Sequence, residues 1–377
     1  MNQTNMTRRS DIHRKNKNGK GMLLKSVVVI ILLALVGTLG YGAKMLTDTK
    51  KVLNSSYRPR ISSKTNKTLP TVDPLKQPIS VLILGIDDND ERGLGSARTD
   101  TMILLTFDSQ KSEVSMVSIP RDTNTQITSD EFVGMDKINT AYTYGKEEAS
   151  IKAVEDLMDI PIDYYATVDF RAFVEVIDAL NGIEVDVPMD INESYASDNS
   201  GKTIVPKGLQ TLDGEKALAF ARIRKIDNDI ERGKRQQIVI EKTIQKAVSS
   251  DLLFNYKDLL NAVDGHFWTD MPSDIMFSIA QHSLNKKFSF NSYAFDWDSY
   301  DDPETGASMV VLFDDSLNYI SHKLRVSLGL DEEDERDEEG YEFQTNGIIS
   351  PKNDPYGNSY GYEQTNNYYD DNSEDGW

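Results

Sequence analysis

The chain has 377 residues, no cysteine and a formal net charge of −20 at pH 7. Its length allows one large domain or two small ones with a substantial core, and the lack of cysteine excludes disulfides, thiol chemistry and cysteine-rich zinc sites. Because the region between the two charged ends is itself acidic, we expect no binding to nucleic acid.

The N-terminal region has the pattern of a membrane anchor. Residues 1–25 contain seven basic residues and one acid, and an apolar run follows. This run is long enough to span a bilayer as a helix, which predicts a basic cytoplasmic tail at 1–21 and a transmembrane anchor at 22–43. Since the basic flank precedes the anchor, we expect a single-pass protein of the cell membrane with an extracellular domain. A cleaved signal peptide is the alternative, but the run exceeds a typical signal core.

The rest of the chain divides into four segments by composition. Residues 44–77 are rich in serine and proline and are predicted to form an extracellular stalk. The main folded domain is predicted at 78–250, with a C-terminal extension at 251–330. Residues 331–377 hold fifteen acids and two basic residues, which predicts an acidic disordered tail.

Three short apolar runs open the main domain. They lie at 79–85, 102–107 and 114–119 and read as strands, the first of them buried on both faces. Charged residues stand at the ends of these runs: Asp87, Arg98, Asp100, Arg121 and Asp122. Open α/β sheets place their ligands at strand ends, so we expect these side chains to share one edge.

The remaining elements alternate between helical and strand patterns. Apolar spacing predicts helices at 147–158, 170–180, 215–221, 236–248, 252–263, 273–284 and 315–326. Strands are predicted at 164–169, 183–187 and 288–297. The order strand, helix, strand over 164–187 indicates a crossover unit, which places the domain in the α/β class.

Two groups of charged side chains point to a diphosphate site. Paired carboxylates at Asp87 and Asp100 suit Mg²⁺, which takes carboxylate oxygen together with substrate phosphate. Arg222 and Arg224 alternate about Ile223, so an extended segment would put both guanidinium groups on one face. Guanidinium forks bind phosphate oxygens bidentately. Surface ion pairing is the alternative for any one of these residues.

Five ordered motifs in this chain strongly resemble the LytR-CpsA-Psr (LCP) family. The motifs are Leu82-Ile83-Leu84-Gly85-Ile86-Asp87, Ser96-Ala97-Arg98-Thr99-Asp100-Thr101-Met102, Val117-Ser118-Ile119-Pro120-Arg121-Asp122, Lys137-Ile138-Asn139-Thr140-Ala141-Tyr142, and Ala221-Arg222-Ile223-Arg224 through Asp229-Ile230-Glu231-Arg232-Gly233-Lys234-Arg235-Gln236-Gln237. The resemblance implies the LCP fold, a mixed central sheet flanked by helices in an α-β-α sandwich, preceded by one transmembrane helix. It makes residues 78–250 the catalytic domain.

The resemblance also implies an activity and its residues. Family members are Mg²⁺-dependent phosphotransferases that move a glycopolymer, wall teichoic acid or capsular polysaccharide, from a polyprenyl diphosphate carrier to peptidoglycan. By position, Asp87 and Asp100 match the metal ligands. The arginines that grip the diphosphate match Arg98, Arg121, Arg222, Arg224 and Arg232.

Two other functions remain open from the sequence. One is a non-catalytic membrane regulator, which the family's older label of transcriptional attenuator suggests, although a 25-residue cytoplasmic tail is too short for a helix-turn-helix. The other is a carrier-lipid-binding protein that grips diphosphates without transferring them. The four histidines show no ligand spacing and are expected to be scattered surface residues. The apolar faces of the helices at 147–158 and 170–180 are expected to be core, with a groove for the polyprenyl chain as the alternative.

Overall fold

The computed structural model describes residues 44–349, apart from 46, 61–70, 87–97, 195–201, 224–228, 250–255, 285 and 304. The chain divides into two compact units, residues 1–51 and 52–377. In the first unit the described residues are helical. The anchor predicted at 22–43 lies outside the described residues, and among those that are described no helix is long and apolar enough to cross a membrane.

The second unit is built on a mixed sheet, as the predicted fold requires. Of the described residues, six strands form this sheet in the order β11-β6-β1-β2-β3-β12. Their bounds are β1 (Ile79–Ile86), β2 (Thr99–Asp108), β3 (Glu113–Ser118), β6 (Tyr164–Asp169), β11 (Phe267–Thr269) and β12 (Ser289–Ala294). β1, β2 and β3 pair antiparallel, whereas β6 and β12 add in parallel on the two sides.

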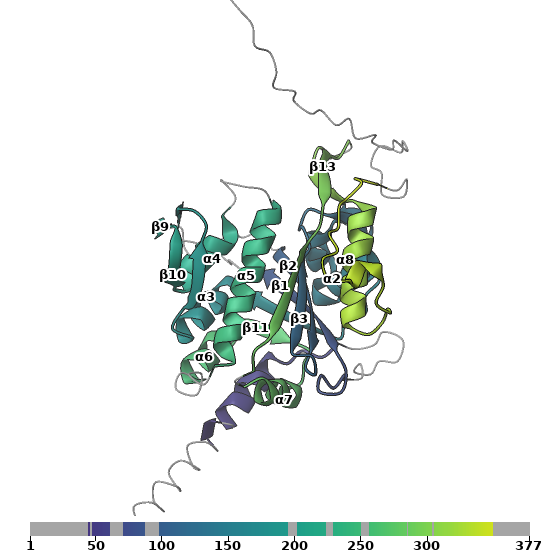
Figure 1. Cartoon of the computed structure of the whole chain (residues 1–377). Coiled ribbons are helices and arrows are strands. Elements are labelled where there is room, and N and C mark those ends of the chain that lie inside the picture. The colour runs from purple at the N-terminus through teal and green to yellow at the C-terminus, as the bar shows by residue number, and fades with distance from the viewer. Residues whose placement is uncertain are drawn as a thin grey trace, which may run out of the picture. The chain divides into compact units, whose positions relative to one another are not determined.

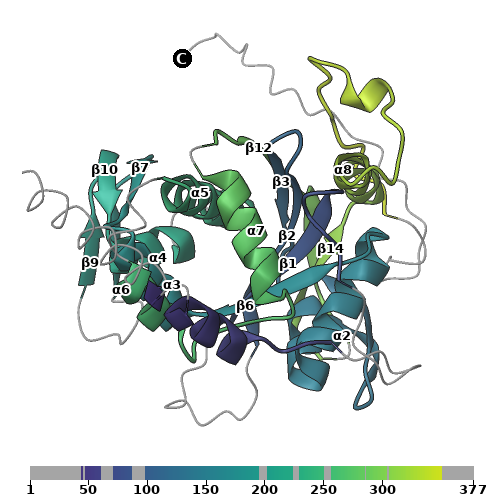
Figure 2. The ribbon, with the colours of Figure 1, turned by 90° about the horizontal axis from the view of Figure 1, so that it is seen from below.

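Helices cover both faces of the central sheet. On one face lie α2 (Ala141–Met158) and α8 (Asp314–Ser327), packed on the side chains of Leu82, Leu84 and Leu104. On the other face lie α5 (Asp229–Ala247) and α7 (Ser273–Ser283) (Figures 1 and 2). The alternation of buried side chains along each strand therefore feeds two separate cores. This arrangement is the predicted α-β-α sandwich.

A second, smaller body stands beside the sheet. It consists of α3 (Phe170–Ala179), β7 (Ile183–Val187), β8 (Ile191–Ser194), β9 (Lys202–Val205), β10 (Gly208–Leu212) and α4 (Gly214–Arg222). β7 pairs with β10 in a sheet of its own, so the predicted crossover of 164–187 within one sheet is wrong. The alternating pattern of β7 buries only one of its faces, which suits a small two-stranded sheet better than a central strand.

The remaining elements line the edges of the unit. They are β4 (Asn124–Thr128), β5 (Val133–Lys137), the 3₁₀ turn Ile138–Thr140, α6 (Tyr256–Val263), β13 (Trp297–Asp301), β14 (Ser308–Leu312) and the 3₁₀ turn Glu335–Asp337. β4 pairs with β5 and β13 with β14, both antiparallel. The helices predicted at 252–263, 273–284 and 315–326 correspond to α6, α7 and α8.

The segment predicted as a stalk is in part docked on the sheet. Residues 52–56 are helical, and the backbone N–H of Arg58 donates to the carbonyl of Thr269 at 2.7 Å. The Arg60 guanidinium binds the Asp270 carboxylate at 2.5 Å, with both side chains mostly buried. The composition, rich in serine and proline, predicted a flexible stalk here. The docking was not predicted because it depends on two single residues, Arg58 and Arg60.

The disorder predicted from Asp331 onward is wrong for residues 331–349. These residues follow α8 and fold back on it, with the carboxylate of Asp337 held by Lys323 at 2.8 Å. Acidic composition favours disorder only while the charges have no partners. Here basic residues of α8 provide them.

Candidate functional site at the edge of the central sheet

The ends of β1, β2 and β3 meet at one edge of the sheet. The register pairs Gly85 with Thr101 and Ile103 with Ser118, so the end of β1, the start of β2 and the end of β3 lie together. A Cβ at Gly85 would lie 2.9 Å from the Cβ of Thr101, which makes glycine necessary at this crossing. Arg98, Asp100 and Arg121 reach this edge, whereas Asp87 and Arg224 lie outside the described residues.

An ion-pair network occupies this edge. A guanidinium nitrogen of Arg121 lies 2.5 Å from an oxygen of Asp100, and both side chains keep about a quarter to a third of their surface exposed. Asp122 binds the ammonium of Lys137 at 2.9 Å and lies 3.5 Å from Arg121. The surface-pairing alternative is thus correct in part, because Asp100 and Arg121 do pair with one another.

Asp100 retains capacity for a further ligand. Its Oδ1 accepts from Arg121, and its Oδ2 accepts no hydrogen bond from the described residues. The residue also lines a small hollow with a volume of about 20 Å³. A partly exposed carboxylate that lines a hollow fits a hard cation such as Mg²⁺.

The hollow lies between the sheet edge and the start of α5. Besides Asp100 it is lined by Arg232, Gln236 and Gln237 of α5 and by Trp297 of β13. α5 approaches the end of β3 closely, since the Ser118 hydroxyl donates to the carbonyl of Gly233 at 3.2 Å. The guanidinium of Arg232 is buried there, with 6% of the residue exposed.

Arg222 reaches the same edge from the smaller body. It is the last residue of α4, and its guanidinium stacks over the Phe170 ring at 4.4 Å, at the end of β6. The extended Arg222-Ile223-Arg224 segment predicted from alternation is therefore wrong at Arg222, which is helical. Ile223 is buried, with 2% of the residue exposed.

Arg235 holds the backbone that presents Arg222. Its guanidinium donates to the carbonyls of Phe220 at 3.0 Å and Ile223 at 2.6 Å. Carbonyls at the end of a helix have no partner within the helix, so Arg235 caps α4 from α5. It is 4% exposed, and its role is to fix the turn that carries Arg222.

Arg98 stands at the open side of the edge. It is exposed, and it lies near Tyr144 of α2. Burial and the Asp136 carboxylate raise the pKa of the Tyr144 hydroxyl, and the charge of Arg98 opposes that rise. The hydroxyl donates to Asp136 at 3.2 Å.

Sequence reasoning missed three residues of this site. Lys137 and Gln237 lie inside the recognised motifs, so their motif membership was the available signal. Gln237 is 1% exposed, and its amide nitrogen donates to the carbonyl of Tyr293 at 2.8 Å. Trp297 lies in no motif and no sequence signal identifies it. Trp297 lines the hollow because β13 packs beside it.

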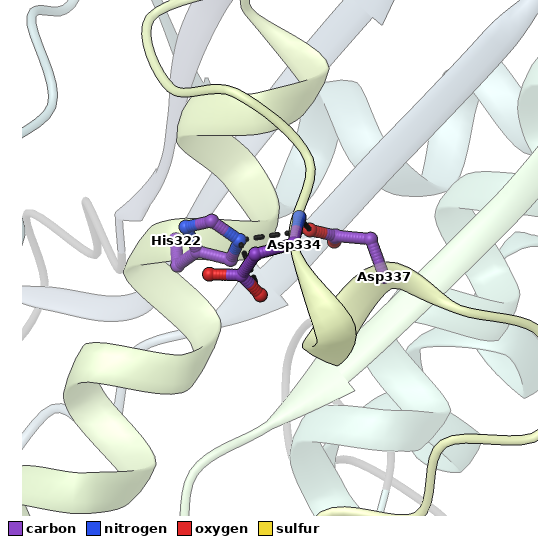
Figure 3. Close-up of side chains that lie close together, drawn as sticks. All are labelled: His322, Asp334 and Asp337. Atoms are coloured by element: carbon purple, nitrogen blue, oxygen red, sulfur yellow. Dashed lines mark hydrogen bonds and ion pairs between the residues drawn. The ribbon is translucent and has the colours of Figure 1, made fainter.

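Among the described residues, one further group has ligand atoms close enough to share a metal ion. It comprises His322 of α8 with Asp334 and Asp337, whose ligand atoms lie within 4.8 Å of one another (Figure 3). His322 is 6% exposed, so its predicted place among scattered surface histidines is wrong. The group is remote in sequence from the predicted ligands Asp87 and Asp100.

Comparison with known proteins assigns the chain to a family. The LytR_cpsA_psr family model matches residues 43–325, and the chain belongs to this family. The teichoic acid transferase TagV of Bacillus subtilis, in full polyisoprenyl-teichoic acid–peptidoglycan teichoic acid transferase, is 37% identical over 231 residues, 60% of this chain and 59% of TagV. The chain spans about 60% of the length of the first curated relatives it matches.

Two solved structures of TagT share the fold. TagT bound to LIIa-WTA has a TM-score of 0.58 and 32% identity, covering 72% of this chain and 97% of that one. TagT with bound octaprenyl pyrophosphate lipid has a TM-score of 0.54 and 31% identity, covering 69% and 94%.

Proposed function

We propose that this protein transfers a teichoic-acid-type glycopolymer from a polyprenyl diphosphate carrier to peptidoglycan. The observation that carries the proposal is the match to TagT with bound octaprenyl pyrophosphate lipid, together with arginines gathered where three strands end. Guanidinium forks bind phosphate oxygens bidentately. TagV and TagT carry the same transferase name.

In the proposed reaction a peptidoglycan sugar hydroxyl attacks the glycopolymer-bearing phosphorus. A new phosphodiester bond forms, the hydroxyl loses its proton, and the bond to the carrier phosphate breaks so that polyprenyl phosphate leaves. Phosphoryl transfer of this type needs positioning and charge neutralisation more than covalent help from the protein. Arg98, Arg121, Arg222, Arg224 and Arg232 are assigned to neutralising the diphosphate.

Mg²⁺ is proposed as the cofactor, held by Asp100 together with Asp87. When bound, it supplies positive charge to the diphosphate oxygens. The observation in favour is that Asp100 keeps one carboxylate oxygen free of hydrogen bonds to the described residues while it faces the hollow.

We assign the polyprenyl chain to the face of the sheet under α5 and α7. On this face the strand side chains are buried, whereas apolar side chains of the helices are only partly buried, among them Ile240 and Ile244 of α5 and Ile275 and Ile279 of α7. The only residue of α7 that is fully buried is Ser283. An apolar layer with spare surface suits a lipid chain. By contrast, Val154 of α2 is 0% exposed and Ile177 of α3 is 1% exposed, as expected of core.

A direct assay tests the transfer. The protein is incubated with a synthetic polyprenyl diphosphate glycan, peptidoglycan oligomers and Mg²⁺, and joined product is sought by mass spectrometry. A joined product that disappears with chelator supports the proposal. Binding of the lipid without any joined product would instead make the protein a carrier-lipid-binding protein.

The membrane topology is a proposal as well. Residues 22–43 would anchor the chain with residues 1–21 in the cytoplasm and the catalytic domain outside, because positive flanks stay inside. An enzymatic reporter fused after Trp377 should be active only on the outer side. Reporter activity in the cytoplasm would overturn this assignment.

A further inference from the structure

The folded segment 331–349, here called the strap, lies beyond the part of the chain that the family model matches. That match ends at residue 325, inside α8, yet the strap is held along α8 and reaches β13 and β14. Because the strap is folded against the domain, we looked for a physical role for it. Its contacts lead to the candidate site by two routes.

The start of the strap is fixed by a clamp around His322. One ring nitrogen of His322 lies 2.8 Å from the Asp337 carboxylate and 3.6 Å from that of Asp334 (Figure 3). The other ring nitrogen lies 3.4 Å from Asp331. Lys323 binds Asp337 at 2.8 Å. Two adjacent residues of α8 thus hold three carboxylates of the strap.

The clamp is balanced in charge without any metal ion. Asp334 binds Arg336 at 2.6 Å, and Asp331 binds Arg325 at 2.9 Å. Each carboxylate of the group therefore already faces a cation. We interpret the group as a mechanical attachment and not as a metal centre, because a cation would have to displace these partners.

The end of the strap caps the first turn of α8. The Thr345 hydroxyl donates to the Asp315 carboxylate at 3.0 Å, and the backbone N–H of Asn346 donates to it at 2.5 Å. The N–H of Asp314 donates to the carbonyl of Ile348 at 2.7 Å. N–H groups in a first helical turn have no acceptor within the helix, so the strap completes this end.

The capped turn of α8 holds one wall of the hollow. The N–H of Phe313 donates to the Asp296 carbonyl at 3.1 Å, and the N–H of Asp296 donates to the Ser316 hydroxyl at 2.9 Å. Asp296 lies between Phe295 and Trp297, and both of these line the hollow. The first route therefore runs from the strap through α8 to Trp297.

The second route runs through β13 and β14. Ile349 packs against Tyr300, Met309 and Val311 of this pair. The N–H of Val310 donates to the carbonyl of Asp122 at 2.9 Å, and the Asn124 side chain donates to the Tyr300 hydroxyl at 2.6 Å. The strap thus backs the turn that carries Arg121.

We propose that the strap is a positioning element for the transfer site, which sets the placement of Trp297 and of the Arg121 turn. The inference deepens the proposed function and rests on it for the activity arm of its test. Groups that act on a transition state must be held in place, and a displacement of about 1 Å can cost up to roughly a hundredfold in rate. Residues of the strap touch the walls, not the substrate, so they are positioning residues.

The first test uses the full chain with Trp268→Phe and Trp377→Phe, which leaves Trp297 as the only tryptophan. Asp337→Asn in this background removes the charge that Lys323 and His322 hold. Glu338→Gln is the matched control, since it removes an exposed neighbouring carboxylate with no side-chain partner among the described residues. We expect acrylamide quenching of Trp297 to rise about twofold in Asp337→Asn and to stay unchanged in the control.

The second test measures transfer. A chain ending at Leu330 lacks the strap, and a chain ending at residue 349 keeps it and is the control. We expect kcat to fall about tenfold in the first with little change of KM for the donor, and to stay at the full-chain value in the second. A melting curve for each chain checks that it folds.

The results of the two tests distinguish failure of the positioning role from failure of the proposed transferase function. Full-chain values of Trp297 quenching in Asp337→Asn and in the strapless chain, with unchanged kcat, would refute the positioning role and leave the transferase proposal standing. If the full chain itself makes no joined product, the transferase proposal fails, and the quenching of Trp297 alone decides the inference.

Discussion

Two clusters in this protein combine aspartates with cationic side chains and differ in solvent access. At the sheet edge, Asp100 and Arg121 keep 30% and 26% of their side-chain surface exposed and border a hollow. In the clamp, Asp337 and His322 keep only 11% and 7%. At the sheet edge, Asp100 has one carboxylate oxygen without a hydrogen bond from the described residues. In the clamp, each carboxylate binds a cationic side chain. Clustered charge alone therefore does not define a site, and spare ligand capacity facing a cavity does.

The largest effect is expected for Asp100→Asn, which tests whether the sheet-edge cluster is the functional one. The change keeps size and removes the charge proposed to hold Mg²⁺, so we expect the transfer rate to fall about a thousandfold, or about 4 kcal/mol in the barrier. The melting temperature should change little, because the residue is partly solvated. Undiminished turnover of the variant in chelator would contradict the metal assignment.

The pair of Arg60 and Asp270 is a third charged contact, and its side chains are about as buried as those of the clamp. Removing one member of a buried pair typically costs about 3 kcal/mol or more, so Arg60→Met should destabilise the fold and leave the chemistry of the surviving protein intact. Burial raises the pKa of Asp270 above its ordinary 3.8, and Arg60 opposes that rise. The variant should therefore have a still higher pKa at Asp270.

The sign of the pH dependence follows from that raised pKa. A carboxyl group with a raised pKa in the folded state favours folding below its ordinary value and loses this contribution as pH rises through the folded pKa. The stability deficit of Arg60→Met should thus be larger at pH 8 than at pH 4, as measured by urea unfolding. An equal deficit at both values would show that Arg60 does not affect the pKa of Asp270.

Arg222 and Arg235 allow a second comparison, between an arginine proposed to bind the diphosphate and one that caps the end of α4. In Arg222→Lys the charge remains and the planar fork is lost, so we expect transfer to slow about a hundredfold, or about 3 kcal/mol, at nearly unchanged stability. Arg235→Met should instead lower the free energy of unfolding by about 2 kcal/mol, because it leaves the buried carbonyls of Phe220 and Ile223 without a donor. The reverse pattern would make Arg222 the structural residue.

The sequence predicted the central sheet from local patterns, and the structure brings Asp100 and Arg121 together at its edge, whereas Asp87 and Arg224 lie outside the described residues. The apolar runs at 79–85, 102–107 and 114–119 are all strands of one sheet, and Asp100, at the start of the second strand, meets Arg121, which follows the third. Short-range periodicity and motif order carry that information. The sequence did not predict that Asp100 pairs with Arg121, because this contact depends on the register between β2 and β3.

The clamp, the docked segment at 57–60 and the place of Trp297 were not predicted. Each depends on contacts between residues distant in sequence, such as Arg60 with Asp270. Arg60 sits in a region whose composition suggests a flexible linker, and Asp337 sits in one that suggests disorder. Composition averages over residues, whereas one well-placed ion pair decides whether such a segment folds onto its neighbour.

The smallest expected effect concerns the pH range over which the strap stays attached. Burial would raise the pKa of Asp337, but hydrogen bonds from Lys323, from the backbone of Asp334 and from His322 outweigh it and hold the pKa at about 2. A carboxylate with a depressed pKa contributes stability above its ordinary value of 3.8 and loses it as pH falls through the folded pKa. The pKa values of Asp331 and Asp334 are depressed in the same direction, each by an arginine partner.

The strap should therefore remain docked from neutral pH down to about pH 4 and detach between there and about pH 2. Quenching of Trp297 by acrylamide, in the background where it is the only tryptophan, reports this detachment. In Asp337→Asn the transition should lose most of its amplitude, because the group that titrates is gone and the hydrogen bonds it made are worth only about 1–2 kcal/mol. A full-sized transition in the variant would assign the detachment to the other aspartates of the clamp.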